Sequence, residues 1–252
     1  MSGHLSIVGL GPGPADLLAP RAASALAEAS DLVGYGPYLD RVPARAGQER
    51  HASDNRAELD RARHALHLTA EGRRVAVVSG GDPGVFGMAA AVFEAVEAHP
   101  PWSALAIEVV PGISALLAAA ARLGAPLGHD FCAISLSDNL KPWETVLARL
   151  RAAAGAGFVI TLYNAASRAR PWQLGAAFEA LRAVLPGMTP VAFATAIGRA
   201  DEAVSIATLD LADPARADMR TLVIVGTAAT RAIPKPDGSC WLYAPRSAVA
   251  PA

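Results

Sequence analysis

The sequence predicts an α/β protein of two domains, the first with a mainly parallel sheet and the second with a mixed sheet. Its 252 residues suit two domains of ordinary size. Up to about residue 125, short apolar runs alternate with Ala-rich helical segments, which is typical of a parallel sheet with helices on both faces. Later apolar runs are joined by short polar turns, which favour antiparallel pairing in the second domain.

The first half shows the alternation most clearly. Strands are expected in four apolar runs, at residues 5–10, 31–35, 74–79 and 106–110. Helices are expected between and after them, at residues 15–29, from a capping box at 55–58, at 89–96, and from 113 to about 124. Right-handed crossovers place the loops that follow parallel strands along one sheet edge, where ligands bind in such folds.

The second half begins at a predicted hinge, Gly124-Ala125-Pro126-Leu127-Gly128. We therefore expect domains at residues 1–125 and 126–245. Five further strands are expected, at residues 131–135, 158–163, 190–194, 204–208 and 222–225. No regular structure is expected from Pro234 onward, and residues 246–252 are expected to form a loose tail.

Charge and cysteine content exclude several classes of protein. The 22 Lys and Arg residues nearly balance 23 Asp and Glu residues, so no overall field attracts nucleic acid or an anionic membrane. Two cysteines are too few for a disulfide framework or an iron–sulfur cluster, so we expect free thiols, a cytoplasmic protein and no bound metal. No export signal precedes the first strand, and no apolar run reaches the roughly 18 residues of a membrane span.

Three glycine-rich loops follow strands of the first half. They read Gly9-Leu10-Gly11-Pro12-Gly13, Ser79-Gly80-Gly81-Asp82-Pro83-Gly84 and Pro111-Gly112-Ile113-Ser114-Ala115. Glycines expose the backbone to a ligand, and the carboxylate of Asp82 can hold an ammonium group or, alternatively, cap a helix. The first loop departs from the G-x-G-x-x-G pattern of dinucleotide-binding folds. Because all three loops are expected at one edge, together they predict a binding pocket.

This set of loops resembles the class III S-adenosylmethionine methyltransferases that act on tetrapyrroles, and the resemblance spans nearly the whole chain. Four further segments are similar to the branch that methylates carbon 17 of precorrin-3B: Gly34-Tyr35-Gly36-Pro37-Tyr38, Ile134-Ser135-Leu136-Ser137-Asp138, Pro142-Trp143-Glu144 and Leu162-Tyr163-Asn164. The resemblance implies the tetrapyrrole methylase fold, with the cofactor in a cleft between two α/β domains, and usually a homodimer. It also implies a polycarboxylate tetrapyrrole substrate and ring contraction to precorrin-4 in cobalamin biosynthesis.

The resemblance also implies which residues line the S-adenosylmethionine site. By matching motifs these are, from the first domain, Pro12, Gly80, Gly81, Asp82, Val85, Ser114 and Ala115, and, from the second, Leu162, Tyr163 and Ala196. The chain departs from the family pattern in three places. Lys141 stands where Thr is common, Ala165 replaces a usual Pro, and residues 194–199 lack an Arg-Asn pair before Gly198-Arg199.

Residue types suggest further roles. Ring contraction requires a proton transfer, for which the acid/base candidates are Asp82, His129, Asp130 and Tyr35. Substrate carboxylates favour guanidinium partners, and the candidates, each also interpretable as a surface residue, are Arg50, Arg56, Arg168, Arg170 and Arg199. His64 and His67 are three apart on one expected helix, and we interpret them as exposed residues because no carboxylate or Cys partner is near in sequence.

Three alternatives stay open at this point. The same fold and cofactor would serve cobalt-factor III of the anaerobic pathway or another position of a precorrin. A dinucleotide-dependent oxidoreductase would use the first glycine loop. A non-catalytic tetrapyrrole-binding protein is the third, and the segment Gly80-Gly81-Asp82-Pro83 argues against it.

Overall fold

The computed structural model describes residues 3–54, 56–167 and 171–247, and divides into two compact units, residues 1–115 and 116–252. The division falls after the first residue of helix α5 (Ala115–Leu123), whereas the sequence suggested a boundary after residue 125. Helix α5 groups with the second unit because its residues bond there. The amide of Leu116 donates to the hydroxyl of Tyr163, and Arg122 pairs with Glu202.

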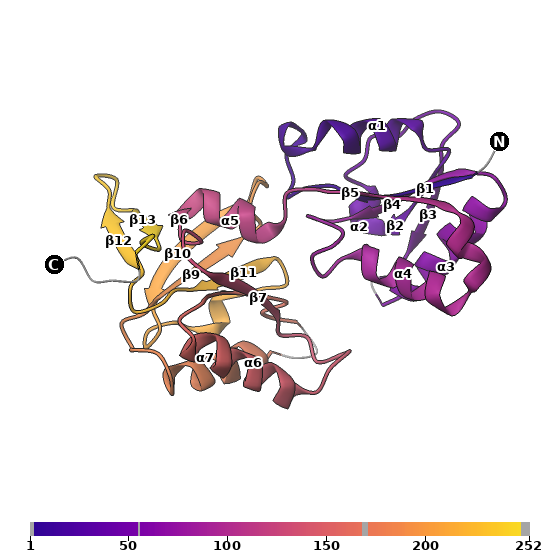
Figure 1. The fold of residues 1–252 in the computed structure, drawn as a ribbon. Coiled ribbons are helices and arrows are strands. Elements are labelled where there is room, and N and C mark those ends of the chain that lie inside the picture. The colour runs from indigo at the N-terminus through magenta and orange to yellow at the C-terminus, as the bar shows by residue number, and fades with distance from the viewer. Residues whose placement is uncertain (1–2, 55, 168–170, 248–252) are drawn as a thin grey trace. The chain divides into compact units, whose positions relative to one another are not determined.

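The first unit is built on a five-stranded sheet in the order β3-β2-β4-β1-β5, and every neighbouring pair is parallel (Figure 1). Its strands are β1 (His4–Gly9), β2 (Asp31–Tyr35), β3 (Glu49–Ser53), β4 (Arg74–Ser79) and β5 (Ala106–Val110). The predicted parallel sheet is thus confirmed. Strand β3 was not predicted, because this edge strand is polar and largely exposed and carries no apolar signal.

Helices cover both faces of this sheet (Figure 1). They are α1 (Pro20–Glu28), α2 (Gly36–Leu39), α3 (Glu58–Ala70) and α4 (Met88–Ala98), with short 3-10 helices at Ala15–Leu17 and Pro100–Ala104. Alternate residues of β4 point to opposite faces, so Val75 and Val77 pack in a core with α3 and α4, while Val78 packs in a core with α1.

Two predicted helix starts differ in the structure. The helix expected at residues 15–29 is interrupted, because Ala19 is extended and Pro20 starts α1 at its first position. The expected capping box begins at Asn55, which lies outside the described residues. Helix α3 begins at Glu58, and its N-cap, Ala57, makes no side-chain hydrogen bond.

The second unit carries a mixed sheet in the order β10-β9-β11-β8-β7, which confirms the second predicted sheet. Its strands are β7 (Phe131–Ser135), β8 (Val159–Tyr163), β9 (Pro190–Thr195), β10 (Ala203–Thr208) and β11 (Thr221–Val225). Only the β7–β8 pair of this sheet is parallel. Helices α6 (Trp143–Gly155) and α7 (Gln173–Arg182) pack on one face over a core that includes Leu162 and Phe193, and a short 3-10 helix lies at Pro214–Arg216.

The absence of regular structure expected from Pro234 onward is wrong. Strands β12 (Arg231–Pro234) and β13 (Cys240–Tyr243) form an antiparallel hairpin, and β13 also pairs with β6 (Gly124–Ala125). Gly238 has a φ of 81° in the turn, where Lys235 accepts a hydrogen bond from its amide. Pro234 is thus the last residue of a strand, and Gly238 is part of the turn that follows it. Of the expected tail, residues 248–252 lie outside the described part.

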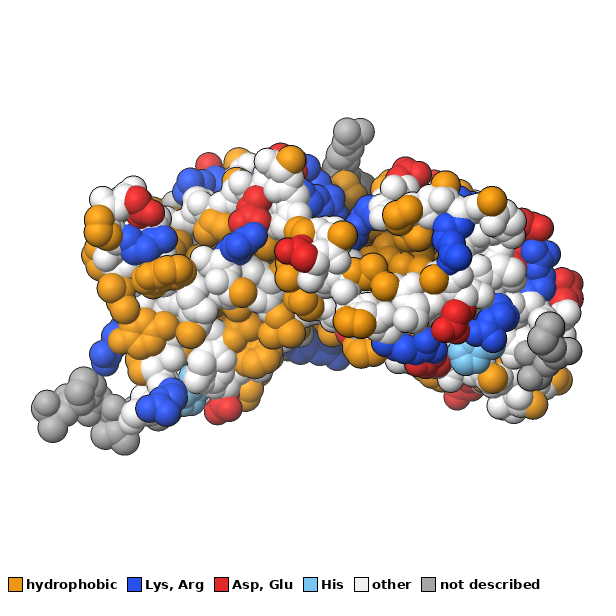
Figure 2. All heavy atoms as spheres, turned by 90° about the horizontal axis from the view of Figure 1, so that it is seen from above, with side chains coloured by type: hydrophobic (Ala, Val, Ile, Leu, Met, Phe, Trp, Pro, Cys, Tyr) orange, Lys and Arg blue, Asp and Glu red, His pale blue; other side chains and the backbone are white. Residues whose placement is uncertain are grey.

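Surface charge and helix length agree with the expectations from composition. On the face seen in Figure 2, Lys and Arg side chains are interspersed with Asp and Glu, as the near-zero net charge leads one to expect. Within the described ranges, no helix combines the length and hydropathy that crossing a bilayer requires.

Candidate functional site

The loops that follow β1 and β4 pair with each other. Gly11 and Gly81 form an antiparallel bridge, in which each amide donates to the other residue's carbonyl at 3.1 Å. Their φ angles are 64° and 67°, a conformation that glycine adopts without a steric cost. The two loops therefore hold one another at the carboxyl ends of neighbouring strands.

Asp82 connects the second of these loops to the third. Its Oδ1 accepts from the amide of Gly84 at 2.8 Å, and its Oδ2 accepts from the amide of Gly112 at 3.0 Å. A carboxylate has about four acceptor positions, so these two bonds leave it capacity for a ligand's ammonium group. The alternative role as cap of the next helix is wrong, because the N-cap of α4 is Gly87, and the first amide of the helix, that of Met88, donates to the hydroxyl of Ser79 at 3.4 Å.

Glycine is required where the three loops touch. A Cβ on Gly112 would lie 2.3 Å from the carbonyl oxygen of Gly81, and one on Gly9 would lie 2.7 Å from the same oxygen. From the position of a Cβ on Gly81, the Cα of Ser114 and the amide nitrogen of Ala115 are both 3.6 Å away. The backbones of the three loops are thus in direct contact, as their expected common edge predicts.

Residues of the α2 region support the loops from the side. The ring of Tyr38 covers Gly80, since a Cβ there would lie 2.7 Å from its Cζ. The ring of Tyr35 meets that of Tyr38 edge-on, at 5.5 Å between centroids. Arg41 donates to the carbonyls of Leu10 and Gly11 at 3.1 and 2.8 Å. Tyr38 lay in a recognised motif without a role, and nothing in the sequence singled out Arg41.

The predicted cofactor residues of the first unit therefore fall in one cluster of loops. Pro12 follows Gly11 and is half-buried, and Ser114 is buried beside Gly81. The amide of Val85 donates to the carbonyl of Asp82 at 3.3 Å. Next to Val85, Phe86 has a φ of 52° and is 55% exposed. A bulky residue in this conformation stores strain, which is common at ligand-binding loops.

In the second unit, three loops share the edge where β7, β8 and β9 end. Strands β7 and β8 are parallel, and β9 runs in the same direction because both β8 and β9 are antiparallel to β11. Asn164 and Ala196 follow β8 and β9 with φ of 54° and 51°. The side-chain amide of Asn164 donates to the hydroxyl of Ser135, the last residue of β7, at 2.8 Å. Left-handed non-glycine residues thus mark two of these three loops.

Two predicted cofactor residues precede Asn164 on β8. Tyr163 is half-buried, and its hydroxyl accepts from the amide of Leu116 at 3.0 Å, which satisfies a free N–H in the first turn of α5. Leu162 is fully buried in the core under α6 and α7. Its side chain is therefore committed to packing, and only its backbone can face a ligand.

A model of the tetrapyrrole (corrin/porphyrin) methylase family matches residues 4–213. The chain belongs to this family. The methylase is 56% identical to the precorrin-3B C(17)-methyltransferase of Sinorhizobium sp., over 98% of this chain and 97% of that protein.

Solved structures give the same result. A crystal structure of the methyltransferase CobJ superposes with a TM-score of 0.93 at 53% identity, over 97% of this methylase and all of that chain. A uroporphyrin-III C-methyltransferase from Thermus thermophilus, complexed with S-adenyl homocysteine, has a TM-score of 0.66 at 25% identity over 89% of this chain and 97% of its own. The methylase is therefore a methyltransferase with the tetrapyrrole methylase fold.

Two of the acid/base candidates of the methylase lie just before β7, away from the edge where the loops of the second unit follow β7, β8 and β9. His129 and Asp130 precede β7, whereas Ser135 ends it, so the strand separates them from the loop edge of their sheet by about 15 Å. The ring of His129 is 3.8 Å from the carboxylate of Asp130, which is 79% exposed. Their assignment to the site is not supported by this placement, and the two residues fit a polar turn.

The candidate arginines of the methylase are dispersed. Arg50 donates to the carbonyls of Leu39 and Val42 and so is used in folding the β2–β3 connection. Arg56 and Arg199 are exposed, and Arg199 lies in the loop after Ala196. Arg168 and Arg170 lie outside the described residues. Of the three described candidates, Arg56 follows β3 and Arg199 follows β9, so both lie in loops at the carboxyl edge of their own sheets.

The departures from the family pattern have local explanations. Lys141 replaces an expected cap, and Pro142 is the N-cap of α6 without a side-chain hydrogen bond. The ammonium of Lys141 donates to the carbonyl of Ser137 at 3.0 Å, and burial, helped by Arg149, lowers its pKa. Ala165 is buried in the core of the second unit.

Proposed function

We propose that this methyltransferase transfers a methyl group from S-adenosylmethionine to carbon 17 of precorrin-3B and contracts the macrocycle to precorrin-4. The observation that carries the choice of substrate is the similarity along 98% of the chain to an enzyme named for that reaction. The contact among three glycine loops around Asp82 supports a methyl-donor site in the first unit.

The residues of these loops fit the chemistry of the donor. Its amino-acid part carries an ammonium group, and Asp82 retains acceptor capacity beyond its two backbone bonds. Gly80 and Gly81 expose the backbone at the end of β4, where amides and carbonyls can bind a nucleoside. We assign Pro12, Val85, Ser114 and Ala115 to the same site, and from the second unit the backbone of Leu162, together with Tyr163 and Ala196.

S-adenosylmethionine supplies a methyl group activated by a sulfonium. Methyl transfer is an in-line displacement, so the main task of the chain is to position the reactants and exclude water. The Gly11–Gly81 bridge and the two bonds to Asp82 fix the loops before a ligand binds. A rigid site of this kind loses little entropy on binding, which favours catalysis by orientation.

Ring contraction needs a group that moves a proton. Tyr35 ends β2 at the same edge as the loops and is half-buried against Tyr38, so we propose its hydroxyl for this role. Asp82 is bonded to two amides and serves binding better than proton transfer. Replacing Tyr35 by Phe keeps the ring contact and should slow formation of the contracted product without weakening donor binding.

The decisive experiment is incubation with precorrin-3B and a donor with a ¹³C-labelled methyl group, followed by NMR of the product. Label at carbon 17 of a contracted ring supports the proposal. Label at another carbon, or turnover only with cobalt-factor III, rejects the assigned substrate in favour of the first alternative.

The remaining alternatives are separated by binding measurements. Calorimetry with S-adenosylhomocysteine and with NADP distinguishes a methyltransferase site from a dinucleotide site, and the former ligand alone should bind. We further propose a cytoplasmic homodimer, for which sedimentation equilibrium should give a mass near twice 25.9 kDa. A single-chain mass would reject the dimer while leaving the reaction unaffected.

A further inference from the structure

Two histidines from different elements meet on the first unit. His51 lies on edge strand β3 and His64 on helix α3, and the Nδ1 of His51 is 3.1 Å from the Nε2 of His64. Their ring centroids are 4.8 Å apart. From the sequence His64 was expected to be exposed, with no carboxylate or Cys near it in sequence, and the residue is exposed in the structure. The sequence did not reveal its histidine partner on β3.

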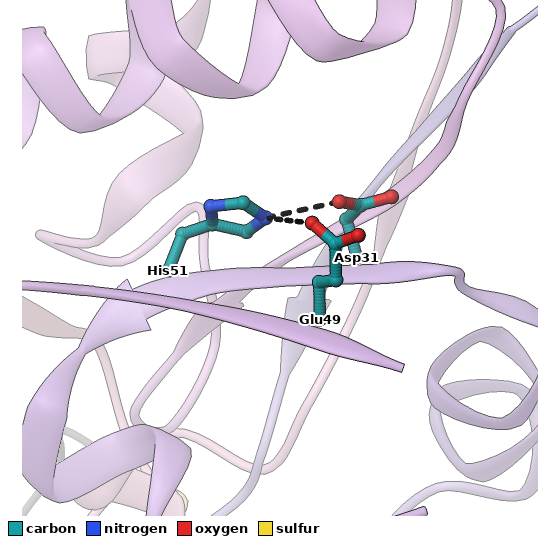
Figure 3. A group of neighbouring side chains, drawn as sticks. All are labelled: Asp31, Glu49 and His51. Atoms are coloured by element: carbon teal, nitrogen blue, oxygen red, sulfur yellow. Dashed lines mark hydrogen bonds and ion pairs between the residues drawn. The ribbon is translucent and has the colours of Figure 1, made fainter. Parts of the chain in front are cut away.

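A buried carboxylate orients the ring of His51. Its Nε2 lies 2.9 Å from the Oδ1 of Asp31, and Figure 3 shows this nitrogen directed toward Asp31 and Glu49. Asp31 is fully buried and also accepts from the Ser30 hydroxyl and from the Nε of Arg73, each at 2.7 Å. Burial alone would raise the pKa of Asp31, but these hydrogen bonds outweigh it and hold the pKa below its usual value.

This arrangement determines which nitrogen of His51 is free of a proton. An ionised carboxylate only accepts hydrogen bonds, so Nε2 carries the proton and donates it to Asp31. In neutral His51, Nδ1 then has a lone pair directed at His64. Burial, followed by the charges of His51 and His67, lowers the pKa of His64, which favours the neutral form of its ring. In the structure the two rings are joined by a hydrogen bond, which the Nε2–H of His64 donates to Nδ1 of His51. A metal ion would replace this shared proton once His64 carries its proton on Nδ1, so that its Nε2 also offers a lone pair.

The separation of these nitrogens suits a metal ion. Imidazole nitrogens bind zinc at about 2.0–2.1 Å, which places two ligands about 3.3 Å apart in a tetrahedral site and about 2.9 Å apart in an octahedral one. The observed 3.1 Å lies between these values. A histidine whose other N–H donates to a carboxylate is the usual form of a metal-binding histidine.

We propose that His51 and His64 form a binding site for a divalent transition-metal ion such as zinc, with Asp31 as the carboxylate that orients His51. A cavity of about 420 Å³ borders both histidines and has room for water ligands. Asp60 also lines it, one helical turn before His64, where its carboxylate pairs with Arg63 at 3.2 Å. An ion there would link edge strand β3 to helix α3.

Neighbouring charges are compatible with a cation at this position. Arg61 lines the cavity, but its guanidinium donates to the Ser53 hydroxyl, the Asp54 carbonyl and the sulfur of Met88. Its charge is thereby engaged by its own surroundings. The other guanidinium at the cavity, that of Arg50, donates to the carbonyls of Leu39 and Val42.

The three-residue group of Asp31, Glu49 and His51 is a less suitable position for the ion. These side chains bring their ligand atoms within 4.8 Å of one another. However, Arg73 donates to Asp31 at 2.7 Å and lies 3.0 Å from a carboxylate oxygen of Glu49, so a guanidinium already neutralises both acids. The Nδ1 of His51 is on the other side of the ring, toward His64.

The test uses the full chain without an affinity tag, freed of metal by a chelator. Titration with cobalt(II), followed by its visible absorption bands, and with zinc in a calorimeter should show one equivalent bound. His51→Gln and His64→Gln should each weaken binding by tenfold or more. The matched control is His67→Gln, on the same helix with its ring against Trp102, which should bind as the unaltered chain does.

Three outcomes would overturn the proposal. They are the absence of saturable binding to the unaltered chain, unchanged affinity in both His51→Gln and His64→Gln, and an equal loss in His67→Gln. The last result would place the ion on the helix alone. Circular dichroism of each metal-free variant checks that it is folded, and a rise in Tm with zinc in the unaltered chain but not in His64→Gln is an independent readout.

Discussion

Replacing Gly112 by Ala tests whether contact among the glycine loops creates the donor site. The new Cβ would lie 2.3 Å from the carbonyl oxygen of Gly81 and 2.9 Å from the carbonyl carbon and oxygen of Gly9. All three are backbone atoms, so no side-chain rotation relieves the clash. Because ordinary contacts begin near 3.4 Å, the third loop must move by about 1 Å from the other two.

The cost follows from what this movement disrupts. Overpacking a tight contact costs about 1–3 kcal/mol, and the bond from the Gly112 amide to the carboxylate of Asp82, 3.0 Å long, contributes about 1.5 kcal/mol more. We expect a loss of about 3 kcal/mol in the free energy of unfolding. For a chain of this size, that lowers Tm by about 6–12 °C.

The assay combines thermal unfolding with calorimetric titration of S-adenosylhomocysteine. Gly112→Ala should bind this ligand at least 30-fold more weakly at a temperature where it is fully folded. Gly155→Ala is the matched control, since a Cβ there meets no heavy atom within 4 Å, and it should keep both Tm and affinity. Unchanged affinity in folded Gly112→Ala would refute the placement of the donor at these loops.

Three further predictions concern single side chains. Asp82→Asn retains one of the two backbone hydrogen bonds and loses the charge, so it should lower the free energy of unfolding by about 2 kcal/mol. In calorimetry it should bind S-adenosylhomocysteine at least tenfold more weakly, and unchanged affinity would contradict the ammonium contact. Asn164→Ala places alanine, which disfavours the left-handed conformation, at a φ of 54° and removes the hydrogen bond to Ser135. Urea unfolding should show a free energy of unfolding lower by about 2 kcal/mol, and an unchanged value would contradict the strain. The pKa of Asp31 is lower in the folded state than in the unfolded state, where it is about 4, so the ionised carboxylate stabilises the fold above pH 4. This stabilisation is lost as the pH falls through the folded pKa. The free energy of unfolding measured between pH 2 and 7 should show this fall in the unaltered chain, and a flatter profile in Asp31→Asn would be expected.

Much of the fold was predictable because its signals are local. Strand β4 was predicted with the bounds it has, since its apolar run is buried on both faces and ends in glycines. Edge strand β3 carried no such signal, because its side chains are largely exposed and a strand at the edge of a sheet needs no apolar pattern. The β12–β13 hairpin was missed for a related reason, since β12 is exposed throughout and so carries no apolar pattern.

The candidate site was predictable to the extent that motifs mark its backbone. Glycines at positions 80, 81 and 112 indicated close approach, and the distances account for that requirement. Supporting side chains left no comparable trace, because Arg41 stabilises the first loop through carbonyls that any sequence would provide. His129 and Asp130 were chosen because their residue types suit proton transfer, whereas their position in the fold, just before β7, is not marked by residue type.

The conformations of Phe86, Asn164 and Ala196 show why the functional loops contain more than their motifs reveal. Each has a positive φ without being glycine, and each lies in a loop that follows a strand at the carboxyl edge of its own sheet. Such a conformation costs about 1–2 kcal/mol for an ordinary residue, so the surrounding bonds must impose it. For Ala196, the amide donates to the carbonyl of Arg220 and the carbonyl accepts from the amide of Arg199. The strain is therefore held by contacts with residues up to 24 positions away in sequence, which explains why it is a property of the fold and why no reading of the loop alone reveals it.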